Sequence, residues 1–203
     1  GQVGQNAFVA MDFPEGQLLS ATIGERLDIH HLIRIGAQLS DALSTIHEQN
    51  VVHGELSPES VLLVPEDKAF LWDMPLVIAN RLTDRRGENR LMQKLVAIAA
   101  YLAPERAQGA GASRAGDVYA LGAVLCAAAG APLPTSATTL GVVHLVANGE
   151  WQPRVPNALP DPWRTMVQRM VSRDPAARPS AYEVAQCFSH QPAPQMLPTV
   201  PEM

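Results

Sequence analysis

The sequence predicts an α+β fold that is mainly α-helical, and three patterns carry this prediction. Between Leu27 and Gln49 apolar residues recur at intervals of three and four, as on one face of a long amphipathic helix. Short apolar runs bounded by Gly, Pro and Asp follow, which is typical of strands and turns. Beyond residue 116, Pro and Gly clusters separate four further helical segments. A few strands followed by a run of helices indicate an α+β architecture.

Strands are expected mainly in the first part of the chain and helices in the remainder. The expected strands cover 8–13, 51–52, 61–64 and 69–72, and the expected helices cover 27–49, 117–129, 139–148, 162–172 and 181–189. Residues 81–90 are polar and charged, which indicates a loop. Residues 191–203 are rich in proline and are expected to form an extended linker or tail.

Composition excludes several classes of protein. The chain has 203 residues, 47% of them hydrophobic, which suits one domain with a buried core. A net charge of −5 without a basic stripe argues against nucleic-acid binding. Cys126 and Cys187 are too few for a disulfide framework or a Cys-rich metal site. Because no apolar run reaches the roughly 20 residues of a membrane span, we expect no membrane insertion in this segment. The predicted location is the bacterial cytoplasm, as a separate protein or as the cytoplasmic part of a larger or membrane-anchored one.

Five short motifs follow one another in a fixed order. They are His53–Ser60 (HGELSPES), Asp73-Met74-Pro75, Ala103-Pro104-Glu105, Asp117–Gly122 (DVYALG) and Asp174–Ser180 (DPAARPS). At this spacing they resemble the H-R-D-L-x-x-x-N loop, the D-F-G and A-P-E motifs, the buried helix and the late D-P-x-x-R-P-S element of bacterial Hanks-type serine/threonine protein kinases. Residues 11–16 (MDFPEG) are similar to the hinge between the two kinase lobes.

The resemblance implies a kinase C-terminal lobe without a complete N-terminal lobe. Residues 1–16 are expected to be a hinge-like strand and an N-lobe remnant, 17–190 the C-lobe, and 191–203 the Pro-rich tail. No Gly-rich phosphate loop is present, and neither Lys68 nor Lys94 stands where kinases place the phosphate-binding lysine. We expect a protein partner, a second copy or an upstream segment to cover the exposed N-lobe face.

Several positions depart from the catalytic pattern of the family. Glu55 replaces the catalytic Asp, and its extra methylene moves the carboxylate by about 1.5 Å, a displacement that can cost on the order of 10²-fold in rate. Ser57 replaces the Lys and Ser60 the metal-binding Asn; Gly54 replaces the Arg of H-R-D, and Ile98 the Thr or Ser before A-P-E. The resemblance therefore implies a degenerate catalytic loop, no metal ion, no cofactor and no enzyme.

Other positions keep the family pattern. The resemblance implies a structural ion pair between Glu105 and Arg178, and backbone hydrogen bonds from residues 52–54 to Asp117. His53 and Met74 would belong to the apolar stack that kinases build between their lobes. A vestigial nucleotide pocket would contain Met11 as gatekeeper, Leu62 as floor and Asp73 as a metal ligand.

The function predicted from these observations is that of an inactive kinase-like module, a pseudokinase that acts as a protein-binding scaffold or regulator in signalling. Two alternatives remain open. One is an atypical active serine/threonine kinase with Glu55 as base, whose N-lobe is supplied upstream or by a partner. The other is a nucleotide sensor without turnover, which a thermal shift with ATP and Mg²⁺ would reveal.

Overall fold

The computed structural model describes residues 2–3, 6–7, 14–24, 27–72 and 98–190. The strands are β1 (Gln2–Val3), β2 (Asn6–Ala7), β3 (Gln17–Leu18), β4 (Val61–Val64) and β5 (Lys68–Leu71). The helices are α1 (Ile29–Glu48), α3 (Pro104–Ala107), α4 (Arg114–Ala128), α5 (Thr139–Asn148), α6 (Trp163–Met170) and α7 (Ala181–Ser189), with 3-10 turns η1 (Leu19–Thr22), η2 (Pro58–Ser60) and η4 (Pro175–Ala177). This α+β, mainly helical fold confirms the predicted class. The expected strand over 8–13, the loop over 81–90 and the tail lie outside the described residues.

Helix α1 forms as the sequence periodicity predicts. Asp28 caps it, because its carboxylate oxygens accept the backbone N–H groups of His30 and His31 at 3.0 and 3.1 Å. Its apolar face, which includes Leu32, Leu39 and other aliphatic residues, is buried against α7, α4 and β5. The helix therefore carries one side of the core and holds the small sheet in place.

The sheet is antiparallel in the order β3-β4-β5, with Leu18 opposite Leu62 and Leu62 opposite Phe70. Gln38 of α1 fixes the β4–β5 hairpin, since its side chain donates to the Asp67 carbonyl at 2.9 Å and accepts from the Ala69 N–H at 2.7 Å. The expected strand over 51–52 is wrong: these residues make no ladder, and the Val51 N–H returns to the Ile46 carbonyl at 3.0 Å.

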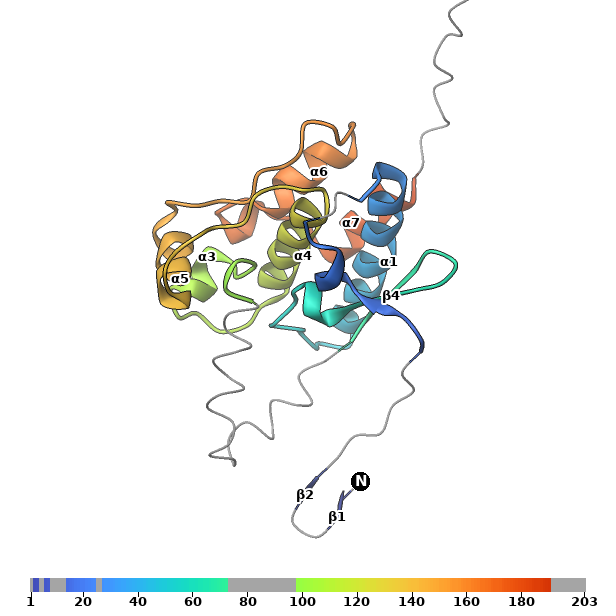
Figure 1. Cartoon of the computed structure of the whole chain (residues 1–203), viewed down its shortest axis with the longest axis horizontal. Helices are drawn as coiled ribbons and strands as arrows, with labels where there is room; N and C mark the ends of the chain where they lie inside the picture. Colours follow the sequence, from blue (N-terminus) through green and yellow to red (C-terminus); the bar gives the residue numbers. More distant parts are fainter. Residues whose placement is uncertain (1, 4–5, 8–13, 25–26, 73–97, 191–203) are drawn as a thin grey trace, which may run out of the picture.

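Helix α4 is the centre of the lobe. Every residue from Gly116 to Ala128 is buried. In Figure 1 it stands between α1 and α7 on one side and α3 and α5 on the other. It begins three residues before the predicted start, because the Ser113 hydroxyl caps it by accepting the Gly116 N–H at 3.0 Å. Among the described helices, none combines the length and the apolar character needed to cross a bilayer.

Candidate functional site

The loop of residues 53–60 is attached to the core by one carboxylate. Asp117 of α4 is 2% exposed. Its Oδ2 accepts the His53 N–H at 2.8 Å, and its Oδ1 accepts the Gly54 N–H at 2.7 Å. His47 near the end of α1 adds a third bond, from its Nε2 to Oδ2 at 2.9 Å. Since a buried carboxylate is stable only when its lone pairs are satisfied, this network ties the loop to α1 and α4.

His53 lies inside this part of the protein rather than at its surface. It is 1% exposed. Its Nε2 lies 3.2 Å from the Trp72 carbonyl, and its Nδ1 lies 3.4 Å from the Glu55 backbone N–H. A ring that carries its proton on Nε2 alone satisfies both contacts, because Nε2 then donates and Nδ1 accepts. The ring therefore orients the loop backbone on which Glu55 stands.

The second half of the loop is closed by Ser57 and Ser60, which are both buried. The Ser60 hydroxyl donates to the Ser57 carbonyl at 2.8 Å and accepts from the Ser57 N–H at 3.0 Å. The Ser60 carbonyl accepts the Trp72 N–H at 3.0 Å, which joins the loop to the end of β5. The hydroxyl and the carbonyl of Ser60 are therefore both hydrogen-bonded within the protein and stabilise this turn.

Glu55 lines a small hollow between the 53–60 loop and α3, whose volume of about 10 Å³ has room for about one water molecule. The lining also includes Ile98, Tyr101, Leu102, Arg106 and Ser113. Burial raises the pKa of Tyr101 to about 12, and the nearby Glu59 charge adds to the shift. The phenol therefore stays protonated at neutral pH.

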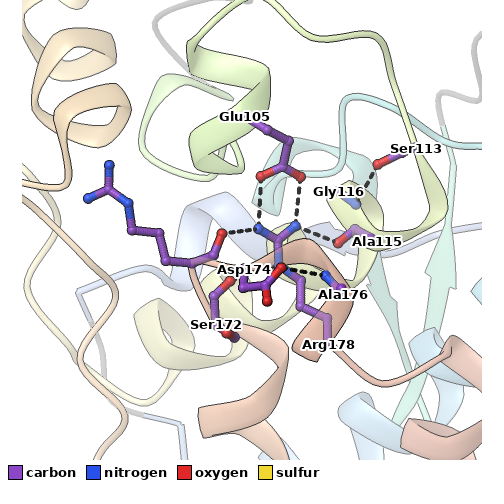
Figure 2. Close-up of polar contacts among 9 residues, drawn as sticks. Glu105, Ser113, Ala115, Gly116, Ser172, Asp174, Ala176 and Arg178 are labelled. Atoms are coloured by element: carbon purple, nitrogen blue, oxygen red, sulfur yellow. Dashed lines mark hydrogen bonds and ion pairs between the residues drawn. The ribbon is translucent and has the colours of Figure 1, made fainter.

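Glu105 of α3 and Arg178, the residue after η4, form the ion pair that the family resemblance implied. In Figure 2 the Arg178 guanidinium lies between the Glu105 carboxylate and the Ala115 carbonyl. Two parallel bonds join it to Glu105, at 2.7 and 2.8 Å, and its Nε donates to the Ser172 carbonyl at 2.8 Å. The Arg173 carbonyl accepts a further bond at 3.2 Å, and the guanidinium lies 4.9 Å from the Tyr119 ring centre. All five N–H donors are used.

The electrostatics of this pair follow from its geometry. Burial alone would raise the pKa of Glu105, but the hydrogen bonds and the positive charge of Arg178 outweigh it, so the pKa lies below the usual glutamate value. Glu105 therefore remains ionised near neutral pH. Its negative charge compensates the positive charge of the Arg178 side chain, which is 0% exposed.

Other residues of the predicted site fall elsewhere. Leu62 is 2% exposed on β4. Lys68 pairs with Glu66 at 2.8 Å on the exposed hairpin. Met11, Asp73, Met74 and Lys94 lie outside the described residues. Cys126 and Cys187 are free thiols, of which Cys126 is buried and Cys187 is half-buried.

The described residues do not by themselves fit a magnesium site. Within the described ranges no group of three or more His, Cys, Asp or Glu side chains could hold a metal ion. Ser60, at the position of the family's metal-binding Asn, is already engaged with Ser57. A metal ion bound beside this loop would need ligands from beyond the described ranges.

Gly54 has a conformation that other residues adopt only with strain. Its φ is +76°, and an added Cβ would lie 3.1 Å from the Ala112 Cβ. From the sequence, Gly54 is seen only as a replacement of the family's Arg. That this position has a positive φ, which favours glycine, is evident only from the backbone. Sequence reasoning also misses His47, although a histidine at the end of an apolar helix face is a usable signal.

Substituting Gly54 by Ala is expected to lower the free energy of unfolding by about 1–2 kcal/mol, the cost of a left-handed residue with a side chain. Urea unfolding monitored by circular dichroism measures this change. Gly111→Ala is the matched control, because no atom lies within 4 Å of the place that its added Cβ would take, and it is expected to change the value by less than about 0.5 kcal/mol. Equal effects of the two variants would contradict the prediction.

Comparison with known proteins gives one consistent result. The family model of the protein kinase domain matches residues 2–191. Serine/threonine-protein kinase PkaA of Streptomyces coelicolor is 33% identical over 189 residues, which cover 84% of this chain and 34% of that protein. PknA of Mycobacterium tuberculosis is 28% identical over 86% of this chain and 40% of its own length. PrkC of Bacillus subtilis is 26% identical over 88% and 27%. The chain thus spans roughly a third of the length of these curated relatives.

These comparisons overturn one prediction from the sequence. The inference that the chain is not an enzyme is wrong, because its relatives are named serine/threonine-protein kinases and the kinase-domain model covers nearly all of it. The substitution at Glu55 keeps a carboxylate on a loop whose backbone is anchored by Asp117, so the changed letter alone was not sufficient ground for that inference. From motif order, fold and relatives together, this chain belongs to the protein kinase superfamily, in its Hanks-type branch.

Proposed function

We propose that this chain is the C-terminal lobe of a serine/threonine protein kinase that transfers the γ-phosphoryl group of ATP to a protein hydroxyl. The observation that carries the proposal is the 53–60 loop, whose backbone is anchored by Asp117 and which carries the Glu55 carboxylate at the position of the family's catalytic Asp. The relatives named above have names that fit this activity.

In this proposal Glu55 acts as the general base. Its carboxylate accepts the proton of the substrate hydroxyl while that oxygen bonds to the γ-phosphorus and the bond to the leaving ADP breaks. His53 positions the Glu55 backbone through its ring, and Asp117 accepts the backbone N–H groups of His53 and Gly54, the two residues before Glu55. Such transfer depends mainly on positioning and charge, so the hydrogen-bonded loop supplies the part of catalysis that a C-lobe can supply.

The proposal also requires groups that grip the phosphates of ATP. We propose that they come from a partner chain, a second copy or another segment of the natural protein that covers the N-lobe face. Lys68 does not serve this role, since it is exposed and bound to Glu66.

The test is phosphoryl transfer by the natural full-length protein to a serine- or threonine-containing protein, followed with γ-labelled ATP. Glu55→Ala and Asp73→Ala are each expected to reduce the rate by at least about 10²-fold, the usual worth of a positioned base. Glu66→Ala is the control, because this carboxylate is 77% exposed and far out on a hairpin, and it should leave the rate unchanged. Absence of transfer by the unaltered protein, or transfer that survives both substitutions, would refute the proposal.

A further inference from the structure

Helix α5 is attached to its neighbours through few buried side chains. It lies at the edge of the molecule and packs mainly on α3 (Figure 1). Val146 is the one buried side chain of α5, and Leu140 is 72% exposed. An isolated helix shorter than about 12–15 residues is marginal in water. The ten residues of α5 therefore depend on contacts with other elements to stay helical.

These contacts include side-chain donors at the C-terminal end of α5. Arg173, three residues after α6, donates from Nη1 to the Asn148 carbonyl and from Nη2 to the Ala147 carbonyl, both at 3.2 Å. Gln108, directly after α3, donates from Nε2 to the same Ala147 carbonyl at 2.8 Å. We call the side chains of Gln108 and Arg173 the α5 cap. Because the last carbonyls of a helix have no partner within it, the α5 cap supplies bonds that the helix itself lacks.

Gly149 makes room for the arginine of the α5 cap. It ends α5 with a φ of +73°, and a Cβ added there would overlap the Arg173 guanidinium. The guanidinium therefore lies directly against the end of the helix, where the aligned peptide dipoles leave partial negative charge. The backbone of Arg173 is fixed separately, because its carbonyl accepts a hydrogen bond from Arg178 at 3.2 Å.

The forces that hold α5 differ from those that hold α4. All three bonds of the α5 cap are exposed to solvent, and two of them depend on the charge of Arg173. Dissolved ions screen the attraction between an exposed cation and a helix end. Helix α4 is buried from Gly116 to Ala128 and is held mainly by apolar packing, which has no such charge to screen.

We propose that α5 is a conformational device that opens as a unit while α4 and the helices packed on it stay folded, and that the α5 cap controls how often it opens. Because Gln108 follows directly on α3, each opening also removes a contact from the helix that carries Glu105. The inference concerns the stability of one element and does not depend on the proposed function.

Amide hydrogen exchange of the full chain, read residue by residue, tests the inference. In the unaltered protein the α5 amides are expected to exchange at least about 10²-fold faster than those of α4, relative to their intrinsic rates. Arg173→Met should speed α5 exchange a further five- to thirtyfold, roughly, and leave α4 unchanged. Arg169→Met is the matched control, because Arg169 is an exposed cation of α6 that lies 3.9 Å from Glu183, and it should leave α5 exchange unchanged.

Salt separates the charged from the neutral part of the α5 cap. Raising sodium chloride to about 1 M, where the screening length is about 3 Å, is expected to speed α5 exchange about two- to fivefold in the unaltered protein. The same increase is expected in Gln108→Ala, which keeps the cation. It should be absent in Arg173→Met, which has lost the charge. The α4 amides of each sample are the internal reference.

Three outcomes would overturn the inference. The α5 amides could exchange as slowly as those of α4, Arg173→Met could behave like Arg169→Met, or the effect of salt on α5 could survive in Arg173→Met. Unchanged α4 exchange shows that each variant folds. The comparison of α5 with α4 in the unaltered chain, and its salt dependence, need no variant.

Discussion

Replacing Arg178 by Met is expected to lower the free energy of unfolding by about 3–5 kcal/mol, the usual cost of removing one partner of a buried ion pair. The substitution leaves the Glu105 carboxylate without its bidentate partner and removes the donors from three backbone carbonyls. Denaturant unfolding measures the loss. Arg169→Met is the control: Arg169 is 48% exposed and lies 3.9 Å from Glu183, so its loss should cost less than about 1 kcal/mol.

The pH dependence of stability provides an independent measure of the same pair. Because the pKa of Glu105 is lower in the folded protein than in the unfolded chain, the pair contributes its full stabilisation above the ordinary glutamate pKa, about 4.5. That contribution is lost as the pH falls through the folded-state pKa. Glu105→Gln should flatten the curve in this acidic window. An unchanged acid limb in Glu105→Gln, or an Arg178→Met variant as stable as Arg169→Met, would contradict the assignment.

Asp117→Asn is the second substitution with a large expected effect, about 3 kcal/mol of unfolding free energy. An amide is nearly the same size, but its NH₂ group would face one of the two backbone N–H donors or His47, so a buried donor loses its acceptor. The loop should then shift, and under the proposed function a shift of about 1 Å at Glu55 would reduce phosphoryl transfer on the order of 10²-fold.

Amide hydrogen exchange at His53 and Gly54, together with denaturant unfolding, measures this effect. Asp41→Asn is the control, because Asp41 is exposed on α1 and its substitution should cost less than about 0.5 kcal/mol. If the His53 and Gly54 amides were as protected in Asp117→Asn as in the unaltered protein, Asp117 would not be their anchor.

The sequence predicts some elements well because their signals are local. Helix α7 is found over the residues for which it is predicted, since Ser180 and Glu183 form a capping box visible in the letters. Strand β3 and helix α3 are not predicted. Each is very short, and β3 exists only through its pairing with β4. Residues 51–52 show the opposite error, because two β-branched residues do not make a strand without a neighbouring strand.

The same limit applies to the site. Motif letters locate Glu105, Asp117 and Arg178, but the contact of His47 with Asp117 joins residues 70 positions apart and depends on how α1 packs on α4. The mistaken inference about enzyme status was drawn from substituted motif residues, and it is the kinase-domain match and the named kinase relatives that overturn it.

The burial of α4 from Gly116 to Ala128 affects how the protein loses its structure. A helix buried on all sides gains its stability from its neighbours rather than from its own turns. It cannot persist once α1 or α6 has departed, and α7 packs on both of these helices. The four helices should therefore melt in one cooperative event. The 53–60 loop is hydrogen-bonded to Asp117 on this helix. We therefore expect the loop to unfold together with the core and not before it.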